Sequence, residues 1–169
     1  FINENYSETN MVETLFCARK ILDKDTLVIY GDIIFDKHIV EKMIESDSNI
    51  SVAVDTDYSD YWKARHGNLF MDSEGIEINA NDKIDKIGFD TTDILFLEAR
   101  YIGILKFSLA GTKTIKSIYD NLRRIVLEKP DQLHDFKNMF MTDFLQKLIE
   151  HKINVRAVKN MRGWLEFDS

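Results

Sequence analysis

The chain has 169 residues, of which 44% are hydrophobic and 30% are charged, and its formal net charge is −7. These values are ordinary for one soluble globular domain or most of one, and the negative charge argues against a nucleic-acid groove or an anionic membrane as the main partner. A single cysteine, Cys17, excludes a disulfide framework and a cysteine-rich metal site. Because no apolar run approaches the ~20 residues of a membrane span and no signal-peptide pattern opens the sequence, we expect a reducing, cytoplasmic setting.

The first third of the sequence has the pattern of alternating helices and strands. Apolar residues recur at helical spacing after Asn10, which together with Glu13 resembles a helix-capping pair. Asp36 can cap a second helix, and two β-branched runs predict buried strands. The predicted order is helix, strand, helix and strand, over residues 11–22, 26–30, 36–44 and 50–54. A strand, a helix and a strand in close succession predict a crossover between neighbouring parallel strands.

The rest of the sequence predicts short strands and two further helices. Residues 57–67, DYSDYWKARHG, have the polar and aromatic composition of a surface loop. Strand-like segments cover residues 68–72, 76–79, 83–88, 99–108, 154–159 and 164–168. Helical patterns cover residues 115–126 and 144–149, and Thr142 is the expected cap of the second. Together these elements predict a single α/β domain over residues 1–169, with a mixed, mostly parallel sheet flanked by helices.

Gly31 and Asp32 directly follow the predicted strand 26–30, which is the position where open α/β sheets bind ligands. Gly31 lets a ligand approach the backbone closely, and one or two carboxylates beside a phosphorylated ligand are typical of a Mg²⁺ site. The plainer alternative is a turn that ends the strand, with Asp32 capping the next segment. Asp32 on its own favours the plainer alternative.

Two other segments carry candidate site residues. In the last predicted strand, Glu166 and Asp168 lie two residues apart and therefore on one face, which suits a divalent cation or, alternatively, a solvated edge strand. Within residues 57–67, Arg65 can hold a phosphate and the aromatic side chains can line a pocket, although surface loops of this kind are commoner. The seven glycines form no G-x-G-x-x-G or G-x-x-x-x-G-K run.

Six segments in order along almost the whole chain resemble the nucleotidyltransferase superfamily, which makes activated sugars and activated choline-type head groups. The branch in question is phosphocholine-cytidylyltransferase-like or sugar-phosphate nucleotidyltransferase. The segments are N-x-x-Y and T-N at residues 3–10, VIYGDIIFD at 28–36, WKAR at 62–65, EARYIGILKFS at 98–108, MTDFLQKLI at 141–149 and GWLEFDS at 163–169. The resemblance implies a Rossmann-like, nucleotide-diphospho-sugar transferase-like fold. It also implies a Mg²⁺-dependent enzyme that transfers a nucleoside monophosphate from a nucleoside triphosphate to a sugar phosphate or phosphocholine-like acceptor and releases pyrophosphate.

The same resemblance implies roles for individual residues. Asp32 and Asp168 are the implied catalytic residues and, with Glu166, the implied Mg²⁺ ligands. Nucleotide contacts are implied for Thr9, Asn10 and Gly31. Contacts with the acceptor are implied for Trp62, Lys63, Arg65, Tyr101, Gly103, Thr142 and Asp143.

The family's glycine-rich loop, G-x-G-x-R, and the proline-lysine that follows it are not in this sequence. We therefore expect a domain truncated at both ends that lacks its N-terminal nucleotide-binding portion. The absent loop favours a second hypothesis, a catalytically inactive nucleotidyltransferase-like module for binding or assembly, whereas the three acidic residues favour the enzyme. The expected partners are the nucleoside triphosphate and the phosphorylated acceptor, and not nucleic acid or a membrane. A homo-oligomer, or association with the missing part of a larger protein, stays open.

Overall fold

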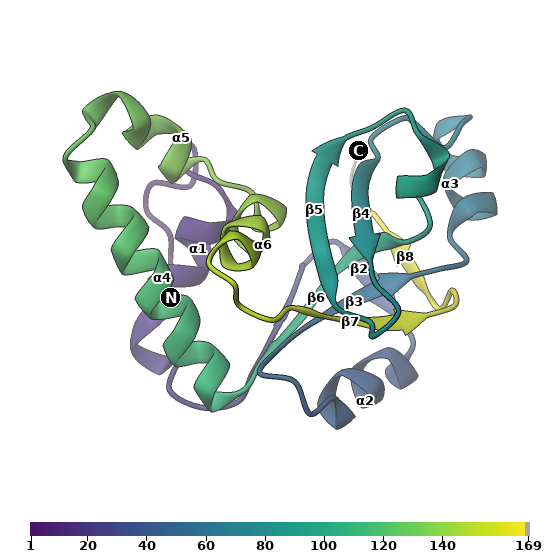
Figure 1. The fold of residues 1–169 in the computed structure, drawn as a ribbon, viewed down its shortest axis with the longest axis horizontal. Coiled ribbons are helices and arrows are strands. Elements are labelled where there is room, and N and C mark those ends of the chain that lie inside the picture. The colour runs from purple at the N-terminus through teal and green to yellow at the C-terminus, as the bar shows by residue number, and fades with distance from the viewer. Residues whose placement is uncertain (168–169) are drawn as a thin grey trace.

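A four-stranded mixed sheet forms the centre of the computed structural model, which describes residues 1–167 (Figure 1). The strands lie in the spatial order β1 (Thr26–Ile29), β6 (Arg100–Phe107), β3 (Ile50–Asp55) and β7 (Arg156–Asn160). β6 is antiparallel to both of its neighbours, whereas β3 and β7 are parallel. Three strands therefore run in one direction and β6 runs in the other, which confirms the predicted mixed α/β sheet.

The predicted crossover has the right strand directions but the wrong neighbours. β1 and β3 run the same way, yet β6 lies between them, and its Phe107 is opposite Thr26 on one side and Ile50 on the other. Ile104, Leu105 and Phe107 are fully buried because β6 is covered on both faces. A strand this apolar is stable in a central position, and the pattern of residues 26–54 carries no information about a strand that comes so much later in the sequence.

Helices cover both faces of this sheet. One face carries α1 (Met11–Cys17), α4 (Leu109–Leu127), α5 (Leu133–Lys137) and α6 (Met141–Glu150), which gather on the left in Figure 1. The other face carries α2 (Lys37–Glu45) and α3 (Ser59–His66). Short 3₁₀ turns lie at Arg19–Ile21, Ile94–Phe96 and Pro130–Gln132. Among the helices of residues 1–167, none is long and apolar enough to cross a membrane.

Two short antiparallel ribbons lie beside the sheet. β4 (Glu74–Ile78) pairs with β5 (Ile84–Asp90), and β5 contacts α6. β2 (Ile33–Phe35) pairs with β8 (Trp164–Glu166), so that Ile33 is opposite Glu166. These two ribbons carry segments from the middle and the end of the sequence to the same side of the sheet, where the cavity described below lies.

Three local predictions differ from the structure. Residues 68–72 form bends and turns rather than a strand, and most of the predicted surface loop forms α3, because Trp62 is buried in the core. α6 begins after Phe140, whose N–H donates to the Asp143 carboxylate at 2.9 Å. Thr142 is therefore not the cap of α6, and its hydroxyl instead donates a hydrogen bond to the Glu74 carboxylate.

Gly111, near the start of α4, is the point where this helix approaches the loop before β3. A methyl group there would overlap the carbonyl oxygen of Asn49, which accepts the Ser108 N–H at 2.9 Å. We expect Gly111→Ala to lower the free energy of unfolding by about 2 kcal/mol, since overlap with backbone cannot be relieved by a rotamer change. Chemical denaturation measures the loss. The exposed substitution Lys113→Ala on the same helix should cost less than about 0.5 kcal/mol, and equal stability of the two variants would contradict this packing.

Candidate active site

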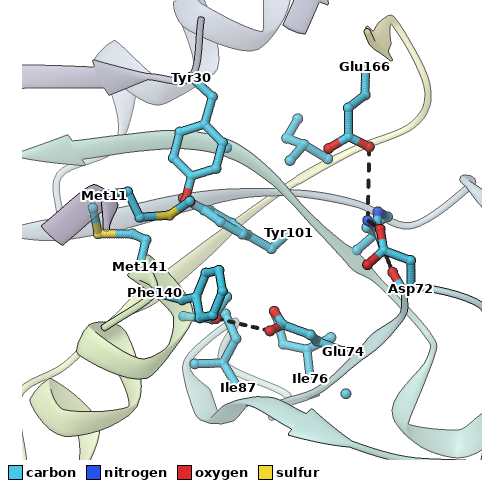
Figure 2. A pocket seen from close by; sticks show the side chains of 15 residues that line it. Met11, Tyr30, Asp72, Glu74, Ile76, Ile87, Tyr101, Phe140, Met141 and Glu166 are labelled. Carbon is cyan, nitrogen blue, oxygen red and sulfur yellow. Dashed lines mark hydrogen bonds and ion pairs between the residues drawn. The ribbon is translucent and has the colours of Figure 1, made fainter. Parts of the chain in front are cut away.

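A cavity of about 210 Å³ lies where the β4–β5 ribbon, β6, the start of α6 and β8 meet (Figure 2). Its walls combine aromatic and methionine side chains with three carboxylates and one guanidinium. The carboxylates belong to Asp72, Glu74 and Glu166, and the guanidinium to Arg100. The cavity therefore has an excess of negative charge together with apolar, polarisable walls.

Arg100 connects the parts of the cavity wall. Its guanidinium lies 3.3 Å from the centroid of the Trp62 ring and donates to the Asp72 carbonyl at 2.9 Å. It also lies 3.6 Å from the Asp72 carboxylate and 4.0 Å from the Glu166 carboxylate. Burial lowers the pKa of Arg100 from its ordinary value, but a guanidinium stays protonated in proteins. Arg100 thus lies within ion-pair distance of two of the three carboxylates, and its charge also acts on the third, Glu74.

Glu74 is the carboxylate without a cationic partner. The Thr142 hydroxyl donates to it at 3.2 Å, and in the described part of the chain the ion pairs of the cavity join Arg100 to Asp72 and Glu166 only. Loss of solvation raises the pKa of Glu74 and the nearby Asp143 charge adds to this rise, whereas the Thr142 hydrogen bond and the Arg100 charge oppose it. The ionised form of Glu74 is therefore unfavourable in this site.

Two tyrosines form the wall next to α1. The rings of Tyr30 and Tyr101 meet edge to face with centroids 5.8 Å apart, and the Tyr30 hydroxyl donates to the sulfur of Met11 at 2.8 Å. The Tyr101 hydroxyl is buried and interacts with the Tyr30 hydroxyl. Burial raises the pKa of both phenols, so both stay protonated. Gly103, at φ +75°, leaves room for the Tyr30 ring, because a Cβ at this position would lie 2.7 Å from Tyr30 Cδ2.

Side chains of α3 and β3 hold β8 in place. The Glu166 N–H donates to the Tyr61 hydroxyl at 3.0 Å, and Arg65 donates to both the Glu166 carbonyl and the Tyr61 hydroxyl. The Trp164 indole N–H donates to the buried Asp55 carboxylate at 2.6 Å. The backbone of β8 is thus fixed from two elements, and with it the position of the Glu166 side chain.

These contacts change the interpretation of the segment WKAR. Trp62 has 0% exposed surface, so it supports the Arg100 guanidinium and has no surface with which to contact an acceptor. Arg65 contacts the backbone of β8, and Lys63 is exposed and does not line the cavity. The cavity walls include none of Trp62, Lys63 and Arg65, and their implied acceptor contacts stay predictions.

The two described segments with implied metal ligands lie side by side. The Asp32 carbonyl accepts the Phe167 N–H at 2.7 Å, next to the pair formed by Ile33 and Glu166. The negative charges of Asp32 and Glu166 both raise the pKa of Tyr30. One Glu166 carboxylate oxygen is buried without a hydrogen-bond partner in the described part of the chain. Within residues 1–167 no three His, Cys, Asp or Glu side chains form a metal site, and Asp168 lies outside the described residues. Because Mg²⁺ needs only one or two carboxylates beside phosphates and water, these acids fit the ion, and the site stays a prediction.

The other implied site residues lie at various distances from the cavity. Tyr101, Gly103 and Thr142 line it. Thr9 and Asn10 precede Met11, which also lines it, and the Asn10 side chain accepts the Met11 N–H at 2.8 Å. Gly31 lies next to Tyr30, and a Cβ at this position would meet nothing within 4 Å. Asp143 caps α6 and lines a different hollow, between α4, α5 and α6.

Four polar residues of the cavity were not identified as site residues from the sequence: Tyr30, Asp72, Glu74 and Arg100. Tyr30 and Arg100 lie within or beside quoted segments and adjoin Gly31 and Tyr101, so proximity to a motif could have pointed to them. Asp72 and Glu74 lie in a stretch of turns and short strands with no motif, and only the three-dimensional fold brings them to the cavity.

Comparison with known proteins gives one relative by sequence and several by fold. No protein-family model matches the sequence. The chain is 34% identical over 174 residues to the CTP:phosphoglutamine cytidylyltransferase of Campylobacter jejuni, and the match covers 99% of this chain and 67% of that protein.

Two solved structures have a similar fold. The inositol-1-phosphate CTP transferase of T. maritima matches 99% of this chain and 59% of its own, with a TM-score of 0.69 and 15% identity. The CTP:phosphocholine cytidylyltransferase of Streptococcus pneumoniae matches 99% of this chain and 62% of its own, with a TM-score of 0.67 and 16% identity. The chain thus spans about three fifths of the length of these two structures, and the match confirms the predicted fold.

Loss of the Tyr61 hydroxyl should loosen β8. We expect Tyr61→Phe to lower the free energy of unfolding by about 1–2 kcal/mol, because the Glu166 N–H and Arg65 both lose an acceptor. Denaturant unfolding measures the difference. Tyr6→Phe is the matched control, since Tyr6 is 77% exposed and its substitution should have no measurable effect. An equally small effect at Tyr61 would show that its hydroxyl does not anchor β8.

Glu74 should make stability depend on pH. A carboxyl whose pKa is raised in the folded state stabilises the fold below its unfolded pKa and loses that contribution as the pH rises through the folded pKa. Glu74→Gln removes this titration and keeps an oxygen for the Thr142 hydroxyl. We expect its melting temperature to exceed that of the wild type at about pH 8, and the difference to shrink towards about pH 4. A variant less stable than the wild type at the higher pH would refute the assignment.

Proposed function

The chain belongs to the nucleotidyltransferase family, in its cytidylyltransferase-like branch, and from this membership we propose that the full-length protein transfers cytidine monophosphate from CTP to a phosphorylated small molecule. The donor nucleotide is inferred from the names of the relatives, which act with CTP. The observation that supports this function within the chain is the position of the Gly31-Asp32 turn. It lies at the carboxyl end of β1 and directly beside β8 with Glu166.

In this reaction a phosphate oxygen of the acceptor attacks the α-phosphorus of CTP. The new oxygen–phosphorus bond forms as the bond to the bridging oxygen of the β-phosphate breaks, and pyrophosphate leaves with both electrons of that bond. The protein forms no covalent bond with the substrates, so it accelerates the reaction by holding the two phosphates in line. The cavity next to Glu166 would hold the rest of the acceptor, with Tyr101 and Thr142 among its walls.

Mg²⁺ is the proposed cofactor, held by Asp32 and Glu166 and by Asp168. When bound, it would neutralise phosphate charge and polarise the phosphorus that is attacked. Asp32 and Glu166 fit this role because their segments are paired and because Glu166 keeps one buried oxygen without a hydrogen-bond partner. An acidic protein can bind phosphates in this way, since the ion rather than the protein supplies the positive charge.

Pyrophosphate release tests the proposal. With CTP, Mg²⁺ and a phosphorylated acceptor, the full-length protein should release pyrophosphate, and Asp32→Asn should lower kcat/KM by at least about 100-fold because a metal-binding charge is lost. Asp36→Asn is the control, since Asp36 is an exposed residue of the same segment and, within residues 1–167, its ion pair is with His38, at 3.9 Å. Activity of Asp32→Asn within a few-fold of the wild type would refute the metal assignment. No pyrophosphate release by the wild type would favour the alternative of an inactive binding or assembly module.

A further inference from the structure

We propose that α3 serves the reaction through the metal, because its inward side chains position Glu166 to bind Mg²⁺. These side chains are Tyr61, Trp62 and Arg65. The inference rests on the proposed function, since it concerns the metal of that reaction. It goes further by giving the segment WKAR a role that needs no contact with the acceptor. Groups that hold a metal ligand in one orientation are commonly as important for binding as the ligand itself.

The backbone of Glu166 is held by two of these side chains. The Tyr61 hydroxyl accepts the Glu166 N–H at 3.0 Å, and Arg65 donates to the Glu166 carbonyl. Arg65 also donates to the Tyr61 hydroxyl at 3.2 Å, so the two side chains and the peptide groups on both sides of Glu166 form one connected set. Because these contacts are made with the backbone, they fix where the Glu166 side chain begins without occupying its carboxylate.

Trp62 acts on the same residue through Arg100. The guanidinium stacks on the buried Trp62 ring, 3.3 Å from its centroid, and donates to the Asp72 carbonyl at 2.9 Å. From this position its Nη2 atom lies 4.0 Å from Glu166 Oε2 (the dashed line at Glu166 in Figure 2), which is beyond hydrogen-bond distance. The stacking thus keeps a positive charge near the carboxylate without a direct hydrogen bond to it.

The Oε2 atom of Glu166 is therefore kept available for a ligand. This oxygen is buried and, among the residues that the structure describes, has no hydrogen-bond partner. Buried polar atoms are rarely left unpaired, and carboxylate oxygens are the protein ligands that Mg²⁺ takes beside phosphates and water. Without the Trp62 ring, the Arg100 guanidinium could move onto Oε2 and compete with the ion. The ring therefore protects the metal-binding atom from its own neighbour.

The alternative role of α3 is the implied contact with the acceptor. Trp62 has no exposed surface, and neither it nor Tyr61 nor Arg65 lines the cavity. The two roles predict different kinetics. A side chain that positions Glu166 sets how much Mg²⁺ the reaction requires, whereas a side chain that contacts the acceptor sets the KM of the acceptor.

Tyr61→Phe separates the two roles in the full-length protein, because it keeps the ring and the charge of the site but removes the acceptor of the Glu166 N–H. Binding of Mn²⁺ alone is measured by electron paramagnetic resonance, and turnover with CTP is measured as pyrophosphate release at varied Mg²⁺. The acceptor is the one turned over fastest among phosphoglutamine, phosphocholine and inositol 1-phosphate, the compounds in the relatives' names. We expect the dissociation constant of Mn²⁺ and the Mg²⁺ concentration for half-maximal rate to rise about tenfold, and the KM of the acceptor to stay within about twofold.

Tyr119→Phe is the matched control, because it removes another largely buried tyrosine hydroxyl, which donates to Glu13 outside the cavity wall. It should leave Mn²⁺ binding unchanged. Trp62→Leu should weaken Mn²⁺ binding as Tyr61→Phe does, and Trp62→Phe should restore much of it, since a phenyl ring still supports the guanidinium.

Two results would overturn the inference and leave the proposed function standing. One is a Tyr61→Phe variant that binds Mn²⁺ as tightly as the wild type. The other is a variant that raises the KM of the acceptor without changing the Mg²⁺ requirement. No pyrophosphate release by the wild type with any of the three acceptors would refute the proposed function and this inference with it.

Discussion

The stacking of the Arg100 guanidinium on the buried ring of Trp62 is the contact on which the rest of the site depends. From this support, 3.3 Å from the ring centroid, the guanidinium reaches the Asp72 backbone ahead of β4 and the Glu166 side chain of β8. Three segments distant in the sequence are thereby held around one positive charge. The stacking also fixes which carboxylates lie within ion-pair distance of Arg100, namely Asp72 and Glu166. The charge of the cavity thus follows from the position of one arginine.

Much of the fold could be predicted from the sequence because its signals are local. The apolar run before Gly31 and the periodicity after Ser108 correspond to β1 and α4. The position of β6 between β1 and β3 could not be predicted in this way, since strand order is decided by non-local packing. The segment around Trp62 was misjudged for a related reason: its polar composition is typical of a surface loop, but Tyr61, Trp62 and Arg65 share one face of α3 and point inward.

The candidate site, like the fold, could be predicted from the sequence only in part. Family motifs led to Tyr101, Gly103, Thr142 and Glu166, which line the cavity, and to Asp32 beside it. They did not lead to Glu74, which lies in a short ribbon without a motif. Glu74 also illustrates how a site can oppose stability, since its ionised form is disfavoured by burial when no ligand is bound.

A crystal structure of the full-length protein with its cytidine-diphosphate-linked product and Mg²⁺ would test the central claim most directly, namely that the cavity beside Asp32 and Glu166 receives the acceptor. The account predicts the phosphates next to Asp32 and Glu166, and the transferred head group in the cavity. A head group bound outside the cavity, or phosphates distant from Asp32, would contradict it.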